Sequence, residues 1–136
     1  MRIKRSSGVL PHPTSLPGPF GIGDFGPEAR RFVDYLAAAG QSFWQIMPLG
    51  PAGYGGSPYA WTSAFAGNVN LISPEELVAA GLLDESDLHD APSFAPDHVD
   101  KGKVIAYKRG LLDRAFHHFK ARGVLAASRR PDLAAR

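Results

Sequence analysis

Two apolar runs separated by a helical pattern organise the first half of the chain. Residues 6–10, "SSGVL", predict a short strand that ends before Pro11. Residues 42–49, "SFWQIMPL", are almost continuously apolar, which is typical of a strand covered on both faces. These two runs are the strong strand predictions of the sequence.

Between the two strands, apolar residues recur at helical spacing over residues 27–39. Pro27 suits the first turn of a helix, where its missing N–H costs nothing, and Gly40 is placed to end it. The order is strand, loop, helix, strand, which predicts a βαβ unit with parallel strands and the α/β class. The loops 11–26 and 50–59 should then lie side by side at the carboxyl ends of the strands, where α/β proteins bind ligands.

The second half of the chain predicts helices rather than strands. Ser73 to Glu76, "SPEE", forms a capping-box pattern for a short helix to about residue 80, which Gly81 ends. Residues 84–101 are acidic and irregular, and a longer helix is expected over 103–121. Because a two-stranded sheet cannot bury its own faces, we expect the chain to be the amino-terminal fragment of a longer protein.

Composition narrows the function classes. The 136 residues are 44% apolar and 21% charged, with a net charge of +2 and no cysteine, as in a globular protein without disulfides or thiol chemistry. No Lys/Arg block suggests nucleic-acid binding, no signal peptide is visible, and no run reaches the ~18 apolar residues of a membrane span. A cytoplasmic location is the expectation.

Several catalytic patterns fail on inspection. "GIGDFG", residues 21–26, matches a dinucleotide motif, but the prolines before it preclude the strand that a phosphate loop must follow, so an oxidoreductase is disfavoured. The five histidines show no metal-ligand spacing, and the acids considered lie on surface positions. We therefore expect no metal, no cofactor and no catalytic residue within this chain.

The loops after the two strands carry aromatic and hydroxyl side chains, which can stack on a sugar ring and hydrogen-bond its hydroxyls. Glycines let the backbone approach a ligand, and prolines stiffen the loop. The alternative is that these aromatic residues cover the edge of the core; for the histidine, a structural hydrogen bond is the alternative. The candidate substrate-binding residues are Tyr54, Ser57, Tyr59, Trp61, His12 and Ser15.

The same segments resemble amylomaltase, the 4-alpha-glucanotransferase or disproportionating enzyme of glycoside hydrolase family 77. The resemblance rests on "SSGVLPHPTSLPGPFGIGDFG", "PEARRFVDYLAAAG", "FWQIMPLGPAGYGGSPY" and "SAFAGNVNLISPEEL", and it returns weakly at "VDKGKVIAYKRGLL". It runs almost unbroken from residue 6 to about residue 77. The chain departs from the usual pattern at Pro11, Ala60, Trp61, Thr62, Val69 and Lys101.

The resemblance implies a (β/α)8 TIM barrel. Residues 1–72 would provide its first two strands and the substrate-groove loops, and residues 73–136 a helical insertion. It implies transfer of α-1,4-glucan segments between malto-oligosaccharides by a retaining mechanism, with both catalytic acids beyond residue 136. It assigns donor-side contacts to Ser57 and Tyr59 and an outer glucan contact to Tyr54. The alternative is a glucan-binding module without turnover.

Overall fold

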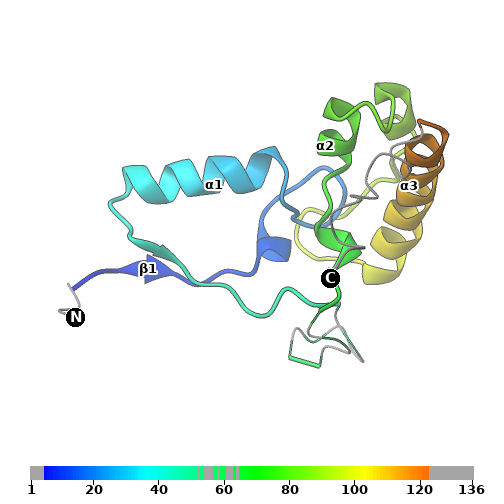
Figure 1. Cartoon of the computed structure of the whole chain (residues 1–136). Helices are drawn as coiled ribbons and strands as arrows, with labels where there is room; N and C mark the ends of the chain where they lie inside the picture. Colours follow the sequence, from blue (N-terminus) through cyan, green and yellow to red (C-terminus); the bar gives the residue numbers. More distant parts are fainter. Residues whose placement is uncertain are drawn as a thin grey trace, which may run out of the picture.

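The computed structural model describes residues 5–51, 53, 57, 59–60, 63 and 65–122. Figure 1 shows a small sheet with α1 at one end of the molecule and a helical region containing α2 and α3 at the other. The elements in chain order are β1 (Gly8–Val9), η1 (Pro13–Ser15), α1 (Pro27–Ala38), β2 (Phe43–Trp44), η3 (Val69–Leu71), α2 (Pro74–Ala79), η4 (Glu85–Leu88) and α3 (Lys101–Ala121).

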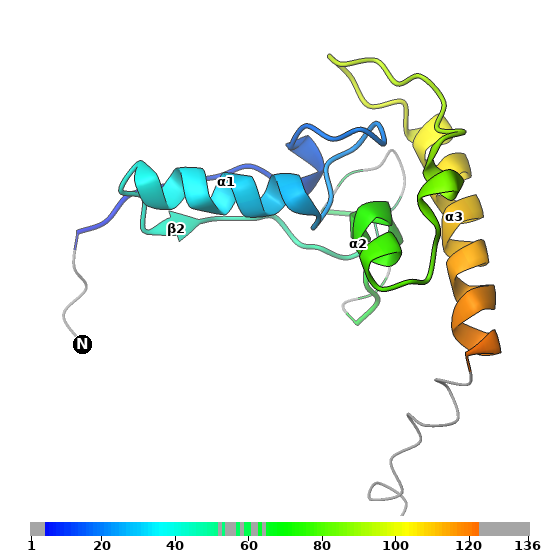
Figure 2. The same ribbon diagram turned by 90° about the horizontal axis from the view of Figure 1, so that it is seen from above.

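The parallel βαβ unit is confirmed. β1 and β2 pair in parallel, with Gly8 opposite Phe43 and Val9 opposite Trp44. The pairing continues at both ends through two 2.9 Å hydrogen bonds, from the Ser42 N–H to the Ser7 carbonyl and from the Gln45 N–H to the Val9 carbonyl. Figures 1 and 2 show α1 running over one face of this sheet.

The prediction that residues 42–49 are covered on both faces is wrong for the described chain. Trp44 faces α1 and meets Phe32 edge to face, with the ring centroids 5.0 Å apart. Its neighbour Phe43 is 61% exposed, and Ile46 is also exposed. Successive strand residues point to opposite faces, and among the described elements α1 covers one face only. The strand is also shorter than predicted, because β2 spans only Phe43–Trp44 of the apolar run 42–49.

The first helix begins where the sequence predicted and ends one residue earlier. Pro27 occupies its first turn, and Ala29 and Leu36, seven residues apart, are buried along one stripe. Gly40 has a φ of +69°, a left-handed conformation that favours glycine and ends the helix. The amphipathic pattern thus predicted this element from local information.

The helical half is organised around α3. The Asp100 carboxylate accepts the Lys103 N–H at 3.0 Å, so α3 begins two residues before the predicted start. Leu83, Leu111 and Ala115 form a buried cluster against which α2 packs. The segment expected to be wholly irregular contains the short helix η4. No helix in the described ranges is long and apolar enough to cross a membrane.

Ser73 caps α2 as the sequence predicted. Its hydroxyl accepts the Glu76 N–H at 3.4 Å. The Glu76 carboxylate contacts the Arg30 guanidinium of α1, so it links the two helices. The predicted end at Gly81 is also confirmed, because α2 stops at Ala79 and Gly81 has a φ of +65°.

Candidate functional site

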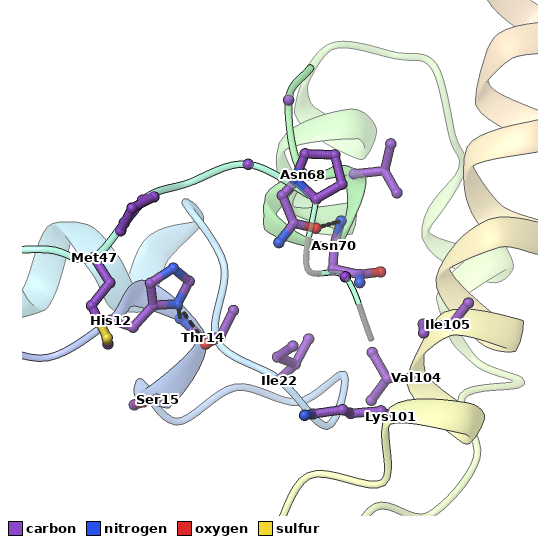
Figure 3. Close-up of a pocket in the computed structure, with 16 residues that line it drawn as sticks. His12, Thr14, Ser15, Ile22, Met47, Asn68, Asn70, Lys101, Val104 and Ile105 are labelled. Atoms are coloured by element: carbon purple, nitrogen blue, oxygen red, sulfur yellow. Dashed lines mark hydrogen bonds between the residues drawn. The ribbon is translucent and has the colours of Figure 1, made fainter. Parts of the chain in front are cut away.

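A pocket of about 620 Å³ lies where four segments meet. The loop after β1 contributes residues between 12 and 22, and the loop after β2 contributes residues between 47 and 53. Residues 67–70 and the first turns of α3 supply the remaining walls (Figure 3). The two loops after the parallel strands therefore share one cavity at the carboxyl end of the sheet, as the sequence predicted.

His12 is a buried member of the pocket wall. It caps η1, because its Nδ1 accepts the backbone N–H of Thr14 at 3.3 Å and lies 2.6 Å from the Thr14 hydroxyl oxygen. With Nδ1 accepting, the neutral ring carries its proton on Nε2. Nε2 is buried and has no hydrogen bond of good geometry within the described residues, although the Pro48 carbonyl is close enough to influence the pKa of the ring.

The environment of His12 favours the neutral ring. Burial lowers the pKa of His12, and the backbone carbonyl of Pro48 opposes this shift in part by favouring the protonated form. Of the two roles that the sequence left open for His12, the structural one is observed, because Nδ1 caps η1, and a ligand contact stays a prediction.

Other polar groups line the pocket alongside apolar side chains. Asn68 caps η3, its amide oxygen accepting the Asn70 N–H at 3.0 Å, and both asparagines border the cavity with Ser15 (Figure 3). Apolar contact area comes from Ile22 and Met47, among others. No carboxylate lines the described pocket wall. The described wall therefore combines hydrogen-bonding groups with apolar patches, as the binding of a hydroxyl-rich ligand requires.

The six residues predicted from the sequence fall into three groups. His12 and Ser15 line the pocket. Ser57 and Tyr59 lie on the adjoining loop, where the Ser57 hydroxyl accepts the Tyr59 N–H at 3.3 Å and the Tyr59 side chain is exposed, but neither is part of the pocket wall. Tyr54 and Trp61 lie outside the described residues.

Sequence reasoning missed a buried ion pair next to the pocket. The Lys108 ammonium lies 2.7 Å from Oδ2 of Asp24, and both side chains are almost fully buried. Burial lowers the pKa of Lys108, and the Asp24 carboxylate opposes this by favouring the charged form. A signal was present: Lys108 lies between Val104 and Leu111 on the apolar stripe of α3, where a lysine needs a partner.

The described residues contain no group of three histidine, aspartate or glutamate side chains arranged to hold a metal ion. Lys101, at the start of α3, borders the pocket and places a positive charge at its rim.

Comparison with known proteins identifies the family of the chain. The family profile of glycoside hydrolase 77, described as 4-alpha-glucanotransferase, matches residues 11–135. The 4-alpha-glucanotransferase of Synechocystis sp. is 52% identical over 126 residues, covering 93% of this chain and 25% of that protein. That of Thermus thermophilus is 48% identical over 120 residues, covering 88% and 23% respectively.

A solved structure is also similar. The amylomaltase from Streptococcus agalactiae, determined in complex with acarbose, superposes with a TM-score of 0.82 at 43% identity. The match covers 87% of this chain and 24% of the amylomaltase chain. The chain therefore spans about a quarter of the length of these similar proteins.

Proposed function

The chain belongs to the glycoside hydrolase 77 family of 4-alpha-glucanotransferases, and on this premise we propose that it forms one wall of an α-glucan groove. The enzyme proposed transfers α-1,4-glucan segments between malto-oligosaccharides. The observation that carries the proposal is the shared pocket of the two loops after β1 and β2, which combines hydrogen-bonding side chains with apolar surface.

The pocket chemistry suits a sugar ring. The amide groups of Asn68 and Asn70 can hydrogen-bond ring hydroxyls, while Ile22 and Met47 can contact the C–H face. We propose that His12 contacts the ligand as part of the same wall. On the adjoining loop, Tyr59 offers an exposed ring for stacking at low cost in conformational entropy. We propose that Ser57 and Tyr59 contact the donor glucan, with Tyr54 and Trp61 further along the same loop.

In this proposal, β1, α1 and β2 are the first units of a (β/α)8 barrel, residues 1–72 carry the groove loops, and residues 73–136 form a helical insertion. The parallel pairing and the superposition with amylomaltase support this. The two carboxylates of a retaining transfer would lie outside residues 1–136. A cytoplasmic location stays part of the proposal.

A second candidate is a glucan-binding module without turnover. The hydrogen-bonding and apolar groups of the pocket support it, because such groups are enough for binding and no pair of acids lies among the described lining residues. Both functions predict that the 136-residue chain binds acarbose or maltoheptaose and leaves maltotriose unchanged. They differ in whether this chain can complete a working transferase.

A chimera tests that difference. The segment of the Thermus thermophilus 4-alpha-glucanotransferase that aligns with this chain is replaced by this chain's residues, and the product is incubated with maltotriose. Formation of both longer and shorter glucans is expected, and the same protein lacking the segment is the control. A folded chimera that binds maltoheptaose but forms no products would overturn the transferase proposal and favour the binding module.

A further inference from the structure

One buried side chain of α3 hydrogen-bonds to two other segments that form the pocket. Lys108 belongs to α3, whose first turns line the cavity. Its ammonium donates to the Asp24 carboxylate at 2.7 Å, to the Asn70 carbonyl at 2.8 Å and to the Ile72 carbonyl at 3.0 Å. A lysine ammonium has three N–H donors, so all of them are used.

Each acceptor belongs to a segment that shapes the pocket. Asn70 is itself a wall residue, and Ile72 follows directly after η3. Asp24 lies on the loop after β1, two residues beyond Ile22, which also lines the cavity. The other Asp24 oxygen accepts the Gly26 N–H at 3.0 Å, so the carboxylate is anchored to the start of α1 as well.

Backbone hydrogen bonds near Asp24 and Asn70 hold the same segments together. The Phe25 N–H donates to the Leu71 carbonyl at 3.0 Å, which brings the loop after β1 against η3, and the Gly23 N–H donates to the Thr14 carbonyl at 3.2 Å. Removing the ammonium would leave a buried carboxylate and two carbonyls without their donor. The loop, η3 and α3 would then have to rearrange to solvate these groups.

We propose that Lys108 is a positioning residue for glucan binding, holding the loop after β1 and the 68–72 segment in the relative placement that shapes the pocket. This rests on the proposed function of the pocket. Lys108 touches no ligand in this role. It acts through Asn70 and through the loop that carries His12, because a displacement of either changes which hydroxyl positions the site can reach.

The test uses a methyl group inside the pocket. The chain contains two methionines, Met1 and Met47, and Met47 lines the cavity. In the full chain with labelled methionine methyl groups, titration with maltoheptaose should shift the Met47 signal and give a Kd. The variants are Lys108→Leu and the double variant Asp24→Asn/Lys108→Leu, neither of which adds a methionine.

A matched control separates positioning from stability. Leu83→Ala removes a buried side chain of the α2–α3 cluster that does not line the pocket, and it should lower the Tm as Lys108→Leu does. All titrations are made at a temperature where circular dichroism shows each variant folded. We expect Lys108→Leu to raise the Kd by roughly tenfold, because a displaced wall would lose one to two hydrogen bonds to the ligand. The Kd of Leu83→Ala should stay within about twofold of the wild-type value.

If Lys108→Leu does not fold, the Kd is measured with the double variant instead, because the double variant leaves no unpaired buried charge. It should regain stability and still bind weakly. A wild-type Kd in folded Lys108→Leu, or in the double variant, would overturn the positioning role and leave the proposed function standing. If the wild-type chain alone does not bind maltoheptaose, the same variants are compared in the chimera. If the chimera does not bind it either, the proposed function fails, and the positioning role with it.

Discussion

Nδ1 of His12 accepts the backbone N–H of Thr14 at 3.3 Å, which fixes the imidazole at the start of η1. The other ring nitrogen is left buried at the pocket wall. One side chain thereby ends an extended segment, begins a helical turn and forms part of the pocket wall. The loop after β1 owes its shape partly to the residue that we propose binds the ligand.

The pKa of His12 predicts how stability depends on pH. Burial lowers this pKa below its ordinary value of 6.5, so the unfolded chain binds the proton more readily than the native chain. This contribution to the free energy of unfolding is fully present above pH 6.5 and is lost as the pH falls through the native pKa. Urea unfolding of the wild type and of His12→Asn between pH 5 and 8 measures it. Asparagine can still cap η1, so the wild type alone should show this component; equal pH dependence in both proteins would contradict the prediction.

Two glycine substitutions should change stability in opposite directions. A Cβ on Gly23 would meet backbone atoms of Pro13 and Leu16, which cannot yield without moving the loop. We expect Gly23→Ala to lower the free energy of unfolding by roughly 1–3 kcal/mol. A Cβ on Gly110, inside α3, meets no atom within 4 Å, so Gly110→Ala should raise it by about 0.5–1 kcal/mol. Thermal unfolding of both variants tests the pair, and a stabilising Gly23→Ala would show that the loop is less tightly packed than described.

The stability that Asp100 gives to the start of α3 should depend on its oxygen as a hydrogen-bond acceptor, and not on its negative charge alone. Asp100→Ala removes the oxygen that accepts the Lys103 N–H and should cost about 1 kcal/mol of unfolding free energy. Asp100→Asn keeps an amide oxygen at the same place and should cost much less. Chemical denaturation measures both values. Equal losses in the two variants would mean that the carboxylate acts through its charge at the helix terminus.

Tyr59 should matter for binding and not for folding. Its side chain is 71% exposed, so Tyr59→Ala should leave the free energy of unfolding within about 0.5 kcal/mol of the wild type. If its ring stacks on the glucan, the same variant should weaken maltoheptaose binding by about 1 kcal/mol, while Tyr59→Phe retains the stacking face. Isothermal titration calorimetry compares the three proteins. Unchanged affinity in Tyr59→Ala would remove this residue from the site.

Local signals in the sequence predicted most of the secondary structure. The apolar spacing over 27–39 with Pro27 and Gly40 located α1 to within one residue. Ser73 was predicted as the cap of α2, and its hydroxyl makes that contact. These predictions succeed because periodicity, caps and turn residues act over a few positions along the chain. The extent of β2 was overestimated because an apolar run does not show whether another element covers each face.

The candidate site was predicted in part. The parallel order of the strands placed both loops at one sheet edge, and His12 and Ser15 were identified there. Asn68 and Asn70 were missed because their segment lies far along the chain from either loop and carries no local motif. The roles of Ser57 and Tyr59 stay predictions.

By itself, the amino-acid sequence determined the family, the parallel βαβ unit and the helices, because these follow from motifs and from spacing over a few turns. Only the tertiary structure decided that Lys108 and Asp24, 84 residues apart, form a buried pair, and that α3 closes the pocket formed by the two strand-end loops. The physical reason is that a buried charge is stable only where the fold brings its partners together, and no local pattern records which distant residue that partner is.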